Sequence, residues 1–149
     1  MDVRELTADD CHLAYLAMRE LRPQVGELES FIARVTRQFA QGYRLIGAFD
    51  GSDGGQEHAI SVAGFRIDEK LAWGRHVYID DLSTLPEGRG RGGATALLRW
   101  IDALAAAEDI TEVHLDSGVQ PERQAAHALY FREGHRISSY HFQKALPSS

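Results

Sequence analysis

The feature that most constrains the fold of this chain is a β-forming run that leads through a glycine-rich connection into an amphipathic helix. The run Trp73–Thr84 is followed by the connection Leu85–Gly93. Apolar residues then recur at helical spacing, at Ala94, Leu97, Leu98, Ile101, Leu104 and Ala105. This change of pattern predicts a strand followed closely by a helix with one face packed against a core. We therefore expect a sheet covered by helices.

Other β-forming runs supply the rest of the expected sheet. They are Val3–Leu6, Tyr43–Phe49, His58–Ile67, Thr111–Asp116 and Ile137–Lys144. The second and third of these runs flank the polar, glycine-rich stretch Asp50–Gln56, which is typical of a hairpin loop. We expect these two strands to pair antiparallel.

Three further helices are predicted from apolar spacing and from signals at their ends. Thr7 and Asp10 have the spacing of a capping box, and the helix that follows is expected to end at Pro23. A second helix carries its apolar residues on one side, at Leu28, Phe31, Ile32, Val35 and Phe39. Pro121 suits the first turn of a last helix and Gly134 suits its end. The order β-α-α-β-β-β-α-β-α-β predicts an α/β (α+β) fold with a mixed central sheet flanked by helices.

Length and composition limit the class of protein. The chain has 149 residues, of which 44% are apolar, so we expect residues 1–149 to form a single domain. No apolar run approaches the roughly 18 residues of a membrane span, and the N-terminus lacks the layout of a signal peptide. We therefore expect a cytoplasmic protein that does not contact membranes.

Charge and cysteine content exclude further classes. The chain carries 22 acidic and 16 basic residues, a formal charge of −6, which argues against binding to nucleic acid. Its single cysteine, Cys11, excludes an internal disulfide and a thiolate metal cage. The histidines lack the spacing of metal ligands, so we expect no metal. Asp116-Ser117-Gly118 with a distant histidine lacks the turn of a serine hydrolase, which disfavours that activity.

The glycine-rich connection has the properties of an anion site. Its glycines allow close approach of the backbone to an oxyanion, and the first N–H groups of the following helix lack intrahelical partners. Arg89 and Arg91 add two cations. The spacing matches neither a Walker P-loop nor a dinucleotide-binding fingerprint. An ordinary glycine-rich connection is the alternative interpretation.

Two motifs resemble the signatures of the GNAT superfamily of acetyl-CoA-dependent N-acetyltransferases. The first, Arg/Gln-x-x-Gly-x-Gly/Ala, is matched by Arg89, Gly92 and Ala94. The second, on the last helix, is matched by Ala126, Leu129, Tyr130 and Gly134. The chain departs from the family pattern where an asparagine is common, at Arg123, and where a phenylalanine is usual, at His135. The resemblance extends from Val3 to Lys144.

The resemblance implies a mostly antiparallel sheet and acetyl-CoA as the acyl donor, without a metal. It implies that the loop binds the pyrophosphate, through Arg89, Gly90, Arg91, Gly92, Gly93 and Ala94. The end of the preceding strand, Leu82, Ser83 and Thr84, would bind the pantetheine arm. Arg123 and Tyr130 are further candidate contacts to the cofactor.

The resemblance also implies direct attack of an amine on the thioester, with Tyr130 as the general acid that protonates the leaving thiolate. Asp80 is the first candidate for the general base and Asp81 the second. By the two-residue period of a strand, we expect these two aspartates to point to opposite faces of the sheet. An aspartate in a β-forming run is unfavourable, which favours a role in function or hydrogen bonding.

The acceptor is expected to be the primary amine of a small molecule, with a protein N-terminus or lysine as the alternative. The resemblance implies that three segments wall the acceptor cleft: the segment from Pro23 through the second helix, the loop near Asp50 and the last strands. The resemblance is compatible with a homodimer and, less readily, with transfer of a longer acyl group. A non-catalytic sensor of acyl-CoA is the alternative to an enzyme.

Overall fold

The computed structural model describes residues 1–51 and 57–148. The chain divides into two compact units, Met1–Leu115 and Asp116–Ser149. The first unit contains the sheet and most of the helices, and the described part of the second contains one α-helix and one 3-10 turn.

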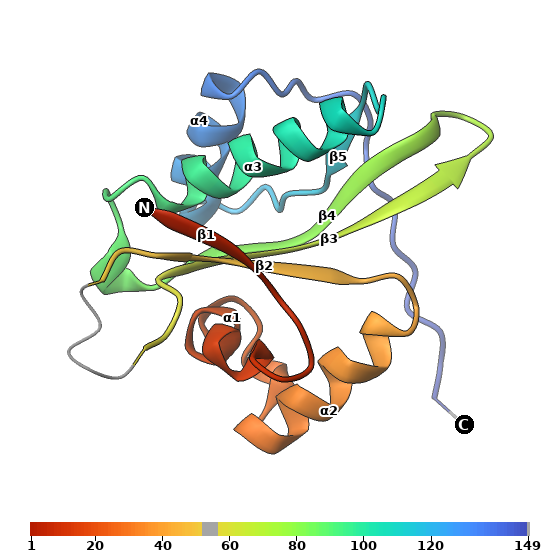
Figure 1. Cartoon of the computed structure of the whole chain (residues 1–149). Coiled ribbons are helices and arrows are strands. Elements are labelled where there is room, and N and C mark those ends of the chain that lie inside the picture. The colour runs from red at the N-terminus through yellow and green to blue at the C-terminus, as the bar shows by residue number, and fades with distance from the viewer. Residues whose placement is uncertain (52–56, 149) are drawn as a thin grey trace. The chain divides into compact units, whose positions relative to one another are not determined.

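The sheet of the first unit has five strands in the order of the sequence (Figure 1). They are β1 (Asp2–Leu6), β2 (Arg44–Phe49), β3 (Ser61–Lys70), β4 (Gly74–Thr84) and β5 (Val113–Leu115). Strands β1 to β4 pair antiparallel, and only the β4–β5 pair is parallel. The mixed, mostly antiparallel sheet is thus confirmed. The predicted hairpin loop Asp50–Gln56 falls largely outside the described residues.

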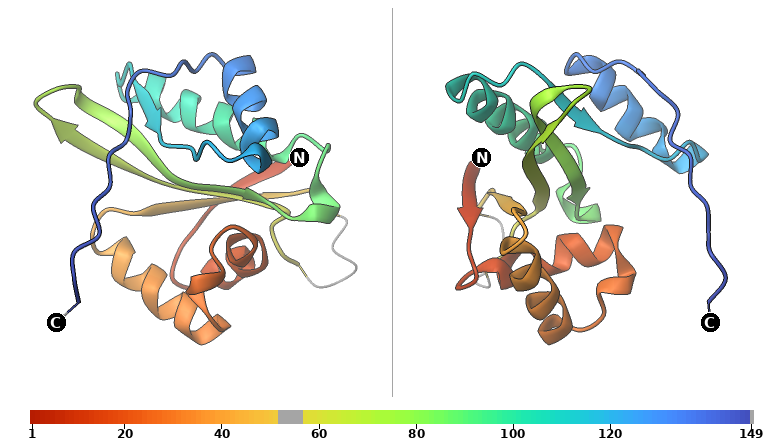
Figure 2. Two further views of the ribbon diagram at one scale, coloured as in Figure 1. Left: turned by 180° about the vertical axis from the view of Figure 1, so that it is seen from behind. Right: turned by 90° about the vertical axis from the view of Figure 1, so that its right-hand side faces the viewer.

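Helices cover both faces of this sheet (Figures 1 and 2). Helices α1 (Tyr15–Leu21) and α2 (Leu28–Phe39) lie on one face, and α3 (Gly93–Ala107) lies on the other. The predicted capping contact is present before α1, because the backbone N–H of Thr7 donates to Asp10 Oδ1 at 2.6 Å. The first turn after it, Cys11–Ala14, is a 3-10 helix rather than an α-helix.

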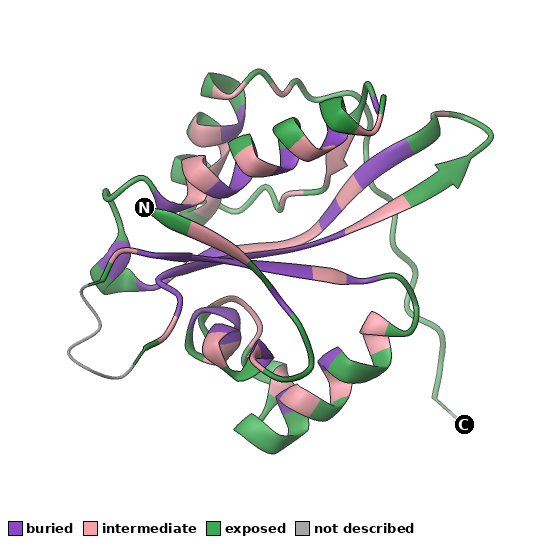
Figure 3. Ribbon diagram, viewed as in Figure 1, coloured by how far each residue is buried: buried purple, intermediate pink, exposed green. Residues whose placement is uncertain are grey.

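The core follows the alternation of side chains along the central strands. Leu45 and Phe49 of β2 belong to the apolar cluster that includes Met18 of α1 and Phe31 of α2. Ile46, one position on from Leu45, is also fully buried and points to the opposite face, which α3 covers. Figure 3 shows this continuous burial along the middle strands. A strand buried on both faces gives the site described below a rigid base.

The second unit contains η4, a 3-10 turn (Pro121–Arg123), and α4 (Gln124–Arg132). Gly134 follows α4 with φ +94°, the left-handed conformation expected of a glycine that ends a helix. The predicted C-terminal signal of this helix is therefore confirmed, whereas Pro121 begins the 3-10 turn that precedes α4 and not α4 itself.

The predicted last strand, Ile137–Lys144, is not formed. Ile137, Tyr140 and Phe142 are 74, 87 and 92% exposed. A strand depends on pairing with a neighbour more than on the β-forming tendency of its residues. The described part of the second unit contains no strand, so this segment has no pairing partner within its own unit. Among the described residues, no helix is long and apolar enough to span a membrane.

Candidate active site

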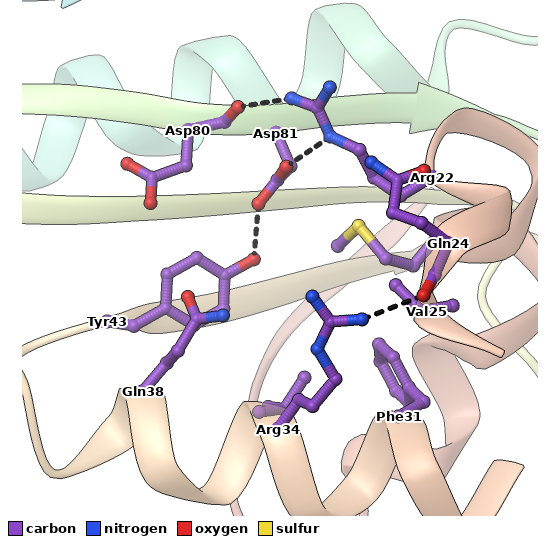
Figure 4. Close-up of a pocket in the computed structure, with 11 residues that line it drawn as sticks. Arg22, Gln24, Val25, Phe31, Arg34, Gln38, Tyr43, Asp80 and Asp81 are labelled. Atoms are coloured by element: carbon purple, nitrogen blue, oxygen red, sulfur yellow. Dashed lines mark hydrogen bonds and ion pairs between the residues drawn. The ribbon is translucent and has the colours of Figure 1, made fainter. Parts of the chain in front are cut away.

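A β-bulge in β4 brings Asp80 and Asp81 to one pocket. The pairing of β3 with β4 skips one residue, because Gly64 is opposite Asp81 while Phe65 is opposite Ile79. Asp80 is the extra residue, and a bulge of this kind redirects side chains. Both aspartates line the same pocket (Figure 4). The prediction that they point to opposite faces is therefore wrong, because the bulge breaks the two-residue period.

The carboxylate of Asp81 is fully engaged by neighbours. Arg22 Nε donates to its Oδ1 at 2.9 Å, and the Tyr43 hydroxyl donates to its Oδ2 at 2.8 Å. Burial and the nearby Asp81 raise the pKa of Tyr43 well above its usual value, so the phenol stays protonated and remains a donor. A side chain at position 64 would overlap the Tyr43 hydroxyl, so Gly64 makes this contact sterically possible.

Asp80 is held on one side only. Arg66 Nε donates to its Oδ2 at 2.8 Å, and Arg66 Nη2 donates to Gln38 Oε1 at 2.9 Å. Asp80 Oδ1 has no hydrogen-bond partner among the described residues. Burial raises the pKa of the Asp80 carboxyl, and the Arg66 charge opposes that shift. A partly desolvated carboxylate with one free oxygen has the properties of a general base.

The pocket in front of these aspartates has a volume of about 310 Å³. Its apolar lining comes from α1, α2 and the turn between them, at Met18, Val25, Phe31 and Val35. One of the three predicted walls, the segment from Pro23 through the second helix, lines this pocket. The loop near Asp50 falls largely outside the described residues, and the predicted last strand is not formed. Figure 4 shows Arg34 rising from α2, while Asp80 and Asp81 come from β4.

The start of α3 is open to an anion. Gly90 and Gly92 adopt left-handed conformations, with φ +79° and +83°, which other residues adopt only at a cost. The first bond into the helix runs from the Ala96 N–H to the Gly92 carbonyl at 2.9 Å. The preceding N–H groups of the first turn have no intrahelical acceptor, and no side chain caps them.

Gly93 brings this helix start against the sheet. A side chain there would overlap the Ser61 hydroxyl of β3, and Ser61 Oγ lies 2.8 Å from Thr84 Oγ1. The predicted loop and the predicted end of β4 are therefore neighbours in the first unit.

The two arginines of the loop differ in their surroundings. Arg91 Nη1 donates to Asp50 Oδ2 at 2.8 Å, which offsets part of its charge. Arg89 is exposed and forms no ion pair within the part of the chain that the structure describes. Ala94 is half-buried in the first turn of the helix. Arg89 is thus the loop cation most available to a ligand.

The end of β4 has one unpaired edge. Strand β5 pairs with β4 only from Val77 to Ile79, while β3 pairs with the other edge as far as Thr84. On the β5 side, the backbone of residues 80–84 faces no strand in the described chain. Leu82 and Ser83 therefore lie on a stretch of backbone with groups available for a ligand.

Tyr130 and Arg123 lie in the second unit. Tyr130 is 7% exposed; burial raises the pKa of its hydroxyl, and the Arg123 charge opposes that shift. A phenol with a raised pKa is protonated at neutral pH and can serve as a proton donor.

The second unit brings a histidine close to Ser117, the serine of the hydrolase alternative. His127 Nε2 lies 2.7 Å from the Gly118 carbonyl and 3.1 Å from Ser117 Oγ. A carbonyl only accepts, so this nitrogen carries a proton and cannot take one from the serine. This arrangement does not fit a serine nucleophile activated by histidine.

Sequence reasoning missed the arginines in and beside the pocket. Arg22 and Arg34 line it, and Arg66 pairs with Asp80. The three come from different segments, and no motif joins them. One signal was available, because a glycine inside a β-forming run, Gly64, often marks a bulge or a close approach. Among the described residues, no three His, Cys, Asp or Glu side chains are grouped as metal ligands.

Known proteins indicate the family to which this sequence is similar. The sequence matches the model of the acetyltransferase (GNAT) family over residues 9–134. No curated protein matches the sequence.

Several solved structures share the fold. A ribosomal-protein-alanine N-acetyltransferase from Brucella melitensis has a TM-score of 0.78 at 17% identity, over 97% of this chain and 100% of that one. An acetyltransferase from Trypanosoma brucei has a TM-score of 0.77 at 19% identity, over 97% and 99%. An aminoglycoside acetyltransferase from an uncultured soil metagenomic sample has a TM-score of 0.75 at 20% identity, over 98% of each chain.

Proposed function

This chain belongs to the GNAT acetyltransferase family, and from that premise we propose that it moves an acetyl group from acetyl-CoA to the primary amine of a small molecule. The observation that carries the proposal is the start of α3. Its uncapped N–H groups and two left-handed glycines form an anion site beside the unpaired edge of β4. A pyrophosphate and an extended amide-bearing arm are the two chemical features of coenzyme A that such a surface would bind.

The residues present fit this donor. The amides from Gly90 to Ala94 would hold the pyrophosphate, and Arg89 would add a charge-assisted contact. The backbone of Leu82, Ser83 and Thr84 would pair with the pantetheine arm as a further strand does. The donor supplies an acetyl thioester, whose carbonyl carbon is the electrophile.

Arg89→Ala is expected to raise the Kd for acetyl-CoA by about 10-fold or more, because a charge-assisted hydrogen bond contributes about 1.5–3 kcal/mol. Titration calorimetry of the wild type and the variant measures this change. Arg37→Ala, an equal loss of charge on the exposed side of α2, is the control and should leave the Kd unchanged. Equal affinity in wild type and Arg89→Ala would contradict the assigned role.

The contacts support Asp80 rather than Asp81 as the general base. Both oxygens of Asp81 already accept hydrogen bonds, from Arg22 and Tyr43. Asp80 lines the pocket and keeps one oxygen without a hydrogen bond to the described residues. We assign Asp81 a positioning role, because it fixes the Tyr43 ring and Arg22 beside the bulge.

The proposed reaction then proceeds in three steps. Asp80 takes a proton from the ammonium group of the acceptor, which frees the nitrogen lone pair. The nitrogen attacks the acetyl carbonyl carbon, so a C–N bond forms and the C–S bond breaks, while backbone N–H groups at the end of β4 stabilise the charge on the carbonyl oxygen. Tyr130 gives its proton to the departing sulfur, the nitrogen loses its second proton to solvent as the amide forms, and solvent restores the protonation states of Tyr130 and Asp80.

The same fold occurs in acetyltransferases with different acceptors, so the acceptor is inferred from the pocket. Among the structural neighbours, one is named for a ribosomal-protein alanine and another for aminoglycosides, so one fold serves very different amines. The size of the pocket, about 310 Å³, lies near the lower end of the usual range for ligand pockets, about 300–1,000 Å³. That size supports a small molecule over a protein.

A further inference from the structure

The pocket contains one positive charge that the protein does not balance. Each of its two aspartates is already paired with an arginine, Asp81 with Arg22 at 2.9 Å and Asp80 with Arg66 at 2.8 Å. Arg34 also lines the pocket, and it forms no ion pair within the described residues. Because Arg66, which pairs with Asp80, lies outside the lining, Arg34 is left in the pocket without a carboxylate partner of its own.

Arg34 is held in place while most of its donors remain available. It is half-buried on α2, and its Nη1 donates to the Gln24 carbonyl at 2.8 Å. A guanidinium has five N–H donors in a rigid plane, so this one contact orients the group and leaves the others unused. Figure 4 shows the guanidinium directed into the pocket, away from the ribbon of α2.

A carboxylate is the partner that this geometry favours. Arginine binds carboxylates through two parallel hydrogen bonds, and partial burial strengthens such a contact. The free oxygen of Asp80 is available on the β4 side of the same pocket, where it would accept from an ammonium group. One small molecule that carries both groups would satisfy both residues at once.

We propose that the acceptor is a small amino carboxylate, whose carboxylate binds Arg34 while its amine faces Asp80. This inference rests on the proposed function of the same pocket, since it assigns the substrate class. The apolar lining from Phe31 and Val35 would contact the hydrocarbon part of that molecule. A large polycation is disfavoured, because its charge would be opposed by Arg34 and its size exceeds a pocket of about 310 Å³.

The test compares free L-amino acids with their C-terminal amides, which have the same amine and side chain but lack the carboxylate. Acetyl transfer to each pair is measured as kcat/KM in the wild type, in Arg34→Gln and in Arg37→Gln. Glutamine keeps a polar side chain that lacks the charge, so Arg34→Gln removes the ion pair proposed with the carboxylate. Arg37→Gln makes the same change on an exposed position of the same helix.

The wild type and Arg37→Gln are expected to prefer at least one amino acid over its amide by about 10- to 100-fold, the range of a charge-assisted hydrogen bond. Arg34→Gln should lose this preference, because its rate with the acid falls much further than its rate with the amide. Equal kcat/KM values for every amino acid and its amide in the wild type would overturn the proposal. So would an equal fall of both rates in Arg34→Gln.

A second measurement separates this inference from the proposed function. If no amine releases thiol from acetyl-CoA, the proposed function fails, and binding of the same amino acids and amides is then measured by calorimetry. Tighter binding of the acid, lost in Arg34→Gln, would still support the amino carboxylate site. Equal binding of acid and amide would overturn it.

Discussion

Asp80→Asn is expected to lower kcat for amine acetylation by about 100-fold or more, because removal of a general base forfeits a factor of about 10² to 10⁴. The amide has nearly the shape of the carboxylate, so Arg66 and the bulge in β4 should keep their places. The Kd for acetyl-CoA should stay within about twofold, since the change leaves the start of α3 intact. Steady-state kinetics and calorimetry measure the two quantities.

The control for this change is Asp109→Asn, which makes the same substitution at an exposed position just after α3. Its kcat should match the wild type. A wild-type rate in Asp80→Asn would remove Asp80 from the mechanism, and a large loss in Asp109→Asn would point to a general effect of charge.

The dependence of acetylation activity on pH should show an acidic limb that is caused by Asp80. Burial raises the pKa of this carboxyl above the usual value of an aspartate, and the base acts only when it is deprotonated. Activity should therefore be lost as the pH falls through this raised pKa, and that acidic limb should be absent from the residual activity of Asp80→Asn.

Tyr130→Phe should lower kcat by about 10-fold or more and leave the Kd for acetyl-CoA nearly unchanged, because the lost proton donation acts in the transition state. Burial raises the pKa of the hydroxyl, so the phenol is protonated at neutral pH and available as an acid. Substrates with a better leaving thiol should reduce the difference between variant and wild type. Kinetics with acetyl-CoA and with an activated acetyl thioester measure this.

Tyr140→Phe is the matched control, because Tyr140 is 87% exposed in the same unit. Equal losses of affinity and turnover in Tyr130→Phe would assign this side chain to binding or packing rather than to proton transfer.

The succession of β4, the glycine-rich loop and α3 could be predicted from the sequence, because the signals for these elements are local. Gly90 and Gly92 have the conformations for which glycine is suited, and α3 begins at Gly93 within one residue of the expected start. Apolar spacing likewise predicted α2 correctly, from Leu28 to Phe39. Helix and turn signals of this kind depend on residues a few positions apart.

The geometry of the pocket was not predictable in the same way. The bulge at Asp80 depends on how β4 pairs with β3, and on the absence of a side chain at Gly64 beneath Tyr43. The arginines that pair with the aspartates come from positions 22 and 66, far away in sequence. Contacts between distant segments leave no periodic signal, so they were missed.

The last strand shows a different limit of sequence reasoning. Residues 137–144 are rich in β-forming side chains, yet they form no strand, because such side chains need a pairing partner. The family match over residues 9–134 ends before this segment. That residues 1–149 form a single domain stays a prediction.

The most direct test of the account is release of free thiol from acetyl-CoA in the presence of a panel of small amines, with the acetylated product identified by mass spectrometry. The account predicts that thiol release depends on an amine, that one acetylated amine forms for each thiol, and that Asp80→Asn abolishes most of the rate. Binding of acetyl-CoA without transfer to any amine would contradict the proposed enzymatic activity and indicate an acyl-CoA-binding module instead. Absence of binding at millimolar acetyl-CoA would contradict the assignment of the site itself.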